Sequence, residues 1–330
     1  MTTKSAGSTP PIPGTNGVAE AQYLRLGGVD QWVLVRGADA ASNPVLVLLH
    51  GGPGISETAY WRYCNSTALE GSYTVVYWDQ RGAGKSYDPA NIPKETMTVE
   101  RLLSDLDELV DFLCERFGKK SVTLFGHSWG SVLGPLYASR FPNKVQAYVG
   151  CGQLGDWAKS ESATYDYALR EAERRGCRRA ATRLRQVGPP PHADAKSLLV
   201  QRNLLAELDG DVSVRGILKQ LRMFHSVPET SVFELFRVYK VVSFSLDAMW
   251  SEVTTLNLVE SVPRLAMPAF FLLGRQDHCV LPEISAEFAD SVESPSKRVV
   301  WFEESGHMPF MDEPGKFNEM MVNLVRPTLD

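Results

Sequence analysis

Ser128 lies at the centre of the pentapeptide Gly-His-Ser-Trp-Gly, which occupies positions 126–130 and could present a serine as a nucleophile. An apolar run precedes it at 121–125 and an apolar segment follows at 131–138, which predicts a strand, a sharp turn and a helix. Because glycine has no Cβ, the flanking elements can pack closely around such a turn. The start of the helix would favour negative charge developing beside the hydroxyl. The pattern predicts that Ser128 is a nucleophile, with a chance match as the alternative.

A serine hydroxyl needs an adjacent base, and two histidines, His278 and His307, come late enough in the chain to be candidates. Asp277 ends the loop after a predicted strand at 269–273, and His307 follows another at 298–302. Because the carboxyl ends of parallel strands meet at one edge of a sheet, we expect these residues to lie beside Ser128. His307 would then accept the serine proton, and Asp277 would orient the imidazole. The alternatives are a loop-capping aspartate, a surface histidine, or an acid supplied by Glu283, Glu303 or Glu304.

An oxyanion forming on the substrate would need two backbone N–H groups aimed at one point. The residue after the nucleophile, Trp129, is expected to supply one of them. The loop 50–54, His-Gly-Gly-Pro-Gly, follows a predicted strand at 44–49, and its Gly52 is the expected second donor. A glycine-rich loop can also bind phosphate, but the chain has neither GxxxxGK[ST] nor GxGxxG.

The elements that must position these residues alternate along the chain. A predicted hairpin (23–26 and 31–35), strands at 44–49, 73–78, 121–125 and 145–149, and helices at 98–117 and 131–142 indicate a mostly parallel sheet covered by helices on both faces. The alternation resumes with strands at 269–273 and 298–302 and helices at 282–291 and 314–324. Residues 18–151 and 263–330 are therefore expected to form one α/β core. Residues 152–262 have helical spacing and are expected to be an inserted cap, after a disordered lead-in at 1–17.

Composition narrows the function classes. Of the 330 residues, 44% are hydrophobic and 22% are charged, as in soluble globular proteins. A net charge of −5 predicts no attraction to nucleic acid or to a membrane. The chain has no apolar run of the ~18 residues that a spanning helix needs. Five scattered cysteines predict reduced thiols and a cytoplasmic location rather than disulfides or a metal site. Seven arginines between 170 and 185 are expected to form a solvated helix face.

The motifs together resemble the α/β-hydrolase family of proline iminopeptidases. They are HGGPG at 50–54, WDQRGxGxS at 78–86, GHSWG at 126–130, GxxD at 274–277 and Gly-His at 306–307. The resemblance implies an α/β-hydrolase fold with a helical cap. It also implies a triad of Ser128, Asp277 and His307, and an oxyanion hole formed by Gly52 and Trp129. The segment Asp-Gln-Arg-Gly at 79–82 is expected to hold loops in place beside the site.

The cap departs from that family's pattern. Proline iminopeptidases bind the substrate ammonium through cap glutamates, one of them within a W-x-x-W-E segment, and this chain has no such segment. The candidate substrate-binding residues are Glu207, Glu229 and Trp250, with Glu234 and Glu252 as further possible anchors. For each glutamate the alternative is an exposed helix carboxylate. An apolar core for the cap is expected from Met223, Phe224, Phe233, Phe236, Phe244 and Met249.

The sequence therefore predicts a serine hydrolase that cleaves a small amide or ester through an acyl-enzyme, with no metal or organic cofactor. The first choice is an aminopeptidase of the proline iminopeptidase type, acting on a short peptide or small molecule. The alternatives are an esterase or amidase for a non-peptide small molecule, and a hydrolase-fold receptor. The sequence predicts no oligomeric state.

Overall fold

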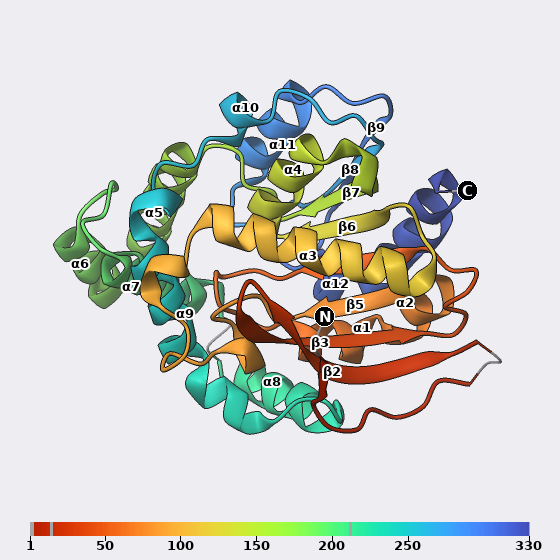
Figure 1. Cartoon of the computed structure of the whole chain (residues 1–330). Coiled ribbons are helices and arrows are strands. Elements are labelled where there is room, and N and C mark those ends of the chain that lie inside the picture. The colour runs from red at the N-terminus through yellow and green to blue at the C-terminus, as the bar shows by residue number, and fades with distance from the viewer. Residues whose placement is uncertain (1–2, 14–15, 211–212, 330) are drawn as a thin grey trace.

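A central sheet of nine strands organises the computed structural model, which describes residues 3–13, 16–210 and 213–329 (Figure 1). The strands lie in the order β1-β2-β3-β5-β4-β6-β7-β8-β9. Their bounds are β1 Thr3–Ser5, β2 Val18–Leu26, β3 Val29–Gly37, β4 Val45–Leu49, β5 Thr74–Trp78, β6 Val122–His127, β7 Val145–Cys151, β8 Ala269–Gly274 and β9 Lys297–Phe302.

Parallel pairing runs from β5 through β4 to β9, whereas β1, β2, β3 and β5 pair antiparallel. The predicted hairpin is β2 and β3, and every strand predicted from the sequence is present. Strands β4, β5, β6 and β8 are buried along their whole length, as expected for strands covered on both faces. The prediction of a mostly parallel sheet is confirmed.

Helices cover both faces of the sheet (Figure 1). One face packs against α3 (Val99–Phe117), α4 (Gly130–Arg140), α10 (Leu258–Ser261) and α11 (Pro282–Ser291), and the other against α1 (Thr58–Cys64), α2 (Ser66–Ser72), α12 (Pro309–Asp312) and α13 (Pro314–Met320). The final helix predicted at 314–324 is shorter, because a π-helical turn begins at Met321. Within the described ranges, no helix is long and apolar enough to cross a membrane.

Between β7 and α10 the described residues form five helices, a segment that we call the cap: α5 (Trp157–Arg174), α6 (Arg178–Val187), α7 (Ala195–Asp209), α8 (Val214–Ser226) and α9 (Val232–Val253). Met223, Phe224 and Met249 are buried as predicted. Phe233 and Phe236 are 72% and 78% exposed, so the expectation that they form the cap core is wrong. The buried positions of α9 begin at Val241, and the first half of the helix has only half-buried and exposed residues.

The N-terminal segment is more ordered than the sequence suggests. Residues 1–2 and 14–15 lie outside the described part, but β1 pairs antiparallel with β2. The Thr9 hydroxyl also donates to Glu229 of the cap. The expectation of a disordered lead-in at 1–17 is therefore wrong for the described residues. The outer edge of β2 has unpaired backbone groups, and a short polar segment can pair with such an edge without an apolar side chain.

Candidate active site

Ser128 occupies the turn between β6 and α4 with a φ of 51°, and among the described residues no other non-glycine residue has a positive φ. A Cβ on Gly126 would lie 2.4 Å from the carbonyl oxygen of Gly130, and one on Gly130 would lie 1.9 Å from that of Leu49. Only glycine fits at these two positions, because strand and helix approach each other too closely for any side chain. The turn therefore holds Ser128 in a costly backbone conformation, of the kind that clusters at active sites.

Asp277 and His307 meet at the same edge of the sheet. Asp277 follows β8 and His307 follows β9, and Asp277 Oδ2 lies 2.8 Å from His307 Nδ1. The other carboxylate oxygen of Asp277 accepts the backbone N–H groups of Cys279 and Val280, each at 2.9 Å. Asp277 is 2% exposed, so three hydrogen bonds fix a carboxylate that is almost fully buried. Its second oxygen is left to orient the imidazole.

The electrostatics of His307 suit a proton acceptor. Burial disfavours the imidazolium, but Asp277 and Cys279 together outweigh it and raise the pKa of His307 well above 6.5. The ring also lies against the thiol of Cys279, which the sequence analysis did not single out. Gly152 leaves room for this ring, because a Cβ there would lie 2.7 Å from His307 Cε1.

The Ser128 hydroxyl makes no hydrogen bond to any described residue, and the residue is half-buried. Nearby, the backbone N–H groups of Gly52 and Trp129 also donate to no described atom. Trp129 is buried, whereas Gly52 is half-buried. Buried backbone donors are nearly always paired in folded proteins, so the N–H of Trp129 beside a strained serine is available to an external acceptor. Catalytic hydrogen bonds often form only when substrate is bound.

A buried pair behind Ser128 was missed by the sequence analysis. His127 Nδ1 lies 2.6 Å from Glu57 Oε1, and His127 Nε2 lies 2.9 Å from the backbone oxygen of His307. Burial raises the pKa of Glu57, but His127, His50 and the N–H of Gly51 outweigh it and lower that pKa. Glu57 also accepts the N–H of Gly51, which precedes Gly52. The pair therefore connects the loop of Gly52 to the loop of His307 by hydrogen bonds. A single glutamate in a loop forms no sequence motif that would predict this contact.

The segment at 79–82 holds loops together, as predicted. Arg81 donates from Nε and Nη2 to Asp105 at 2.7 and 3.1 Å, and from Nη2 to the carbonyl of Gly27 at 2.8 Å. Asp79 accepts the backbone N–H of Lys85 at 2.8 Å. Gln80 donates its backbone N–H to His50 Nε2 at 3.0 Å, so His50 is satisfied within the core.

A cleft of about 750 Å³ lies between the core and the cap, and His307 is one of its lining residues. Its wall is chemically mixed. Apolar side chains such as Leu205, Met223 and Met308 alternate with charged ones, which are Arg175, Arg202, Lys219, Asp209, Glu304 and Asp312. Arg202 pairs with the buried Glu161 and donates to the carbonyl of Cys279 at 2.9 Å. A guanidinium therefore contacts the loop that carries Asp277.

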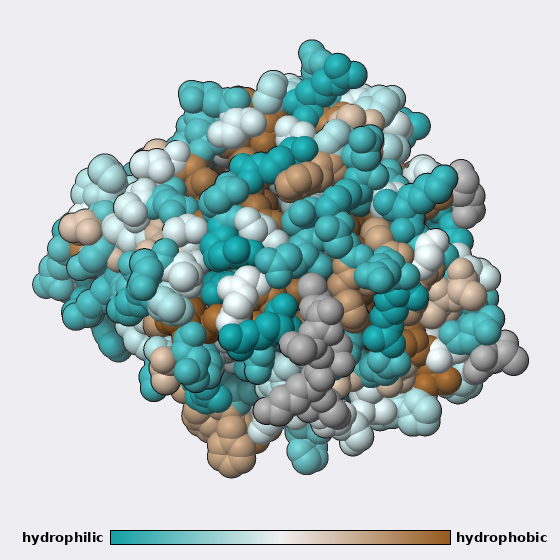
Figure 2. All heavy atoms as spheres, in the orientation of Figure 1, coloured by the Kyte–Doolittle hydropathy of each residue, from teal (hydrophilic) through white to brown (hydrophobic). Residues whose placement is uncertain are grey.

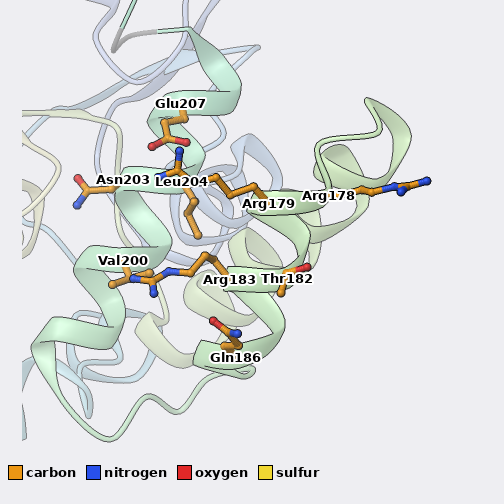
Figure 3. Close-up of a pocket in the computed structure, with 9 residues that line it drawn as sticks. All are labelled: Arg178, Arg179, Thr182, Arg183, Gln186, Val200, Asn203, Leu204 and Glu207. Carbon is orange, nitrogen blue, oxygen red and sulfur yellow. The ribbon is translucent and has the colours of Figure 1, made fainter.

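The structure does not bring the three predicted substrate residues into this cleft. Glu207 is exposed in a separate groove between α6 and α7, together with Arg178, Arg179 and Arg183 (Figure 3). Trp250 lines a small cavity within the cap, of about 120 Å³. The α7 residues that line the cleft are Arg202, Leu205, Ala206, Leu208 and Asp209. Glu207 points away from it, towards α6.

Glu229 is buried instead in an ion-pair network that joins cap and core. Its carboxylate lies 3.2 Å from Arg62 Nη2 and 3.7 Å from Arg36 Nη1, and both arginines also pair with Glu70. The further candidates are engaged as well: Glu234 pairs with Lys85, and Glu252 accepts the N–H of Val99 at the start of α3. These three glutamates fasten the cap to the core.

Two of the alternatives for the base and the acid have other partners. His278 Nδ1 is 3.0 Å from Asp209 Oδ1, and its ring stacks on Tyr167 with centroids 4.2 Å apart. Glu303 pairs with Arg275 on the surface. Neither residue reaches the imidazole of His307, whose Nδ1 is held by Asp277.

Comparison with known proteins agrees with this architecture. Residues 44–314 match the family described as having the alpha/beta hydrolase fold. The chain is 30% identical over 308 residues to a Bacillus subtilis protein named probable aminopeptidase YbaC, covering 93% of this chain and 96% of that protein. It is 24% identical over 312 residues to the proline iminopeptidase of Lactobacillus delbrueckii subsp. bulgaricus, covering 91% and 95%.

Among solved structures, a proline iminopeptidase-related protein of Thermus thermophilus superposes with a TM-score of 0.63 at 20% identity, covering 94% of this chain and 100% of that one. At that identity the superposition shows the fold alone. The family match spans most of the sheet and the whole cap, and it includes Ser128, Asp277 and His307. The chain belongs to the α/β-hydrolase fold family and is similar to hydrolases of the aminopeptidase type.

Proposed function

We propose that the chain is a serine hydrolase that cleaves a small amide or ester through an acyl-enzyme on Ser128. The observation that carries the proposal is the convergence of a strained serine with the Asp277–His307 pair at one edge of the sheet. In the first step Ser128 Oγ bonds to the substrate carbonyl carbon, and its proton passes to His307 Nε2. The oxyanion accepts hydrogen bonds from the N–H groups of Gly52 and Trp129.

The intermediate then collapses, and the leaving amine or alcohol departs with the proton from His307. Water enters, gives a proton to His307 and attacks the acyl carbon. Collapse of the second intermediate returns the proton to Ser128 Oγ and releases the acid. Asp277 stabilises the imidazolium in both halves of the cycle, because its carboxylate already holds Nδ1. The Glu57–His127 pair positions the two loops that carry Gly52 and His307.

Labelling with a fluorophosphonate, followed by mass spectrometry, tests this mechanism. A single adduct on Ser128 is expected, with none on the Ser128→Ala variant. An intact, folded chain that forms no adduct would reject the enzyme and favour the hydrolase-fold receptor.

Within this class we propose an aminopeptidase as the first candidate, supported by the names of the relatives. The cleft offers Asp209 for an ammonium in place of Glu207. The second candidate is an esterase or amidase for a non-peptide substrate, which is favoured by the half-buried Arg202 in the cleft, because a guanidinium repels an ammonium.

Matched variants on α7 separate the two candidates. Asp209→Asn alters the cleft, whereas Glu207→Gln alters the exposed groove two residues earlier. An aminopeptidase should hydrolyse aminoacyl-arylamides and lose kcat/KM in Asp209→Asn but not in Glu207→Gln. Turnover of aryl esters alone, unchanged in both variants, would reject the aminopeptidase and support the esterase.

A further inference from the structure

Large apolar side chains are exposed on α8 and on the first half of α9. Eight large hydrophobic side chains are exposed among the described residues, and six of them lie there. We call these six the α8–α9 apolar patch: Val214, Ile217, Leu218, Phe233, Phe236 and Tyr239. Their exposed fractions range from 50% to 78%. Figure 2 shows apolar surface at the lower edge of the molecule, where Figure 1 places α8.

The spacing shows that this exposure is organised. On α8 the three patch residues fall at positions i, i+3 and i+4, which places them on one side of the helix. Another side buries Met223 and Phe224, and the Phe224 ring packs edge-on against Tyr60 of the core. On α9 the three aromatic residues recur every third position. Each helix therefore has an apolar side facing water in addition to the side it buries, and such surface marks an interaction site.

The charges around the patch have one sign. Between 213 and 240 every exposed charged side chain is a cation: Arg215, Lys219, Arg222, Arg237 and Lys240. The two acids of the segment, Glu229 and Glu234, are paired with Arg62 and Lys85. The whole chain carries −5, so the positive sign is local to this region of the cap.

We propose that the α8–α9 apolar patch docks the protein on an anionic lipid surface. Aromatic and aliphatic side chains would enter the boundary between headgroups and acyl chains, and the flanking cations would meet the headgroups. This inference goes beyond hydrolysis and does not depend on it. It also revises the expectation, drawn from net charge alone, that the protein has no membrane partner, because net charge does not report a local cluster.

A second copy of the chain fits the patch less well. A symmetric dimer would place the same surface of both copies face to face, and its five cations would then meet their own equivalents. Like charges across an interface oppose association. An anionic lipid surface satisfies the apolar and the cationic residues together.

Docking would also bring the cleft that His307 lines close to the lipid surface. Gly216, Lys219 and Met223 of α8 line that cleft, so the helix that carries half of the patch forms one wall of it. A substrate held in the lipid would then meet the cleft entrance directly.

Co-sedimentation of the full chain with phosphatidylcholine vesicles, with and without phosphatidylserine, tests the proposal. Binding should need phosphatidylserine and weaken as salt is added. The double variant Phe233→Ser/Phe236→Ser should lower the partition coefficient by about tenfold or more. Arg237→Gln/Lys240→Gln should lower it by about tenfold on anionic vesicles alone. All four side chains are exposed, so the variants should keep the thermal midpoint of the parent chain.

The controls lie outside the patch. Arg178→Gln/Arg179→Gln removes two exposed cations from α6, and Val299→Ser removes an exposed apolar side chain from β9; neither should change binding. Equal binding by the patch variants and the parent chain, or no binding to anionic vesicles at low salt, would overturn the proposal. A dimer in sedimentation velocity that Phe233→Ser/Phe236→Ser dissociates would instead assign the patch to a second copy.

Discussion

Functional side chains at the carboxyl edge of the sheet are held by hydrogen bonds and close packing, whereas several candidate residues of the cap are exposed. At the edge, Asp277 engages both carboxylate oxygens with named partners, and Ser128 is held at a φ of 51° by close packing on either side. In the cap, Glu207 is exposed in a groove away from the cleft, and Phe236 is 78% exposed to solvent.

This difference separates reaction class from specificity. Residues at the edge are placed by strands whose order and register leave little freedom, so their motif predicts their positions. Residues in the cap are placed by the rotation and packing of helices, and a rotation by one position turns a side chain from the cleft to the solvent. The motifs therefore predict the reaction class from the core. They do not predict substrate choice, which depends on the cap side chains that line the cleft.

The largest expected effect comes from removing the hydroxyl of Ser128, the proposed nucleophile. Ser128→Ala is expected to lower kcat by about 10⁴-fold or more, measured with an aryl ester. Ser128→Gly should be equally inactive yet more stable than Ser128→Ala by about 1 kcal/mol, because glycine accepts a positive φ without strain. Equal midpoints in urea for the two variants would contradict a strained turn.

Removing the charge on Asp277 tests how strongly this carboxylate raises the pKa of His307. Asp277→Asn should lower kcat by about 10³- to 10⁴-fold. The carboxylate raises the pKa of His307 above 6.5, and activity requires the neutral imidazole, so kcat/KM of the parent chain should fall as pH drops through that raised pKa. In the variant the same limb should move to lower pH. A limb that stays in place would show that another group titrates.

Close packing at the edge can be tested by adding one methyl group. Gly130→Ala should lower the free energy of unfolding by about 3 kcal/mol, since its Cβ would lie 1.9 Å from a backbone oxygen. Gly71→Ala is the matched control, because no atom lies within 4 Å of its added Cβ. Denaturation in urea measures both. A Gly130→Ala chain as stable as the control would refute the close approach of β4 and α4.

Glu229 was expected to bind substrate, but its substitution should reduce the stability of the fold. Glu229→Gln should cost about 2–4 kcal/mol of unfolding free energy, because it leaves two buried arginines short of a partner. Burial raises the pKa of Glu229, but Thr9 and Arg62 outweigh it and lower that pKa. The stabilisation is therefore present above the ordinary glutamate pKa, and it is lost as pH falls through the lowered one.

Glu207→Gln is the smallest expected effect. An exposed carboxylate without an ion pair should change the unfolding free energy by no more than about 0.5 kcal/mol, and kcat/KM should stay within about twofold. Thermal melts and steady-state kinetics measure both quantities. A large loss of kcat/KM would restore Glu207 as a substrate anchor.

Local patterns were sufficient for most of the core. Alternating and continuous apolar runs predicted β2 to β9. The helix predicted at 98–117 is α3, which ends before the left-handed Gly118. Both signals arise within a few residues of chain, where backbone geometry and burial act directly. The helical spacing predicted for 152–262 agrees with the helices between β7 and α10, whereas the cap boundaries stay a prediction. The sequence did not predict which side of a cap helix is buried. Phe233 was expected in the cap core because it is apolar, but it is exposed, since burial depends on whether another element covers it.

The sequence alone determined the order of the strands along the chain, the nucleophile turn, and the loops that end in Asp277 and His307, because glycines and apolar runs restrict the backbone locally. Only the tertiary structure decided which groups those loops meet. It placed Glu57 next to His127, positioned Glu229 between two arginines, turned Glu207 away from the cleft and left Phe233 and Phe236 of α9 exposed. Such contacts join residues up to about two hundred positions apart, and no local pattern encodes the packing angle that brings them together.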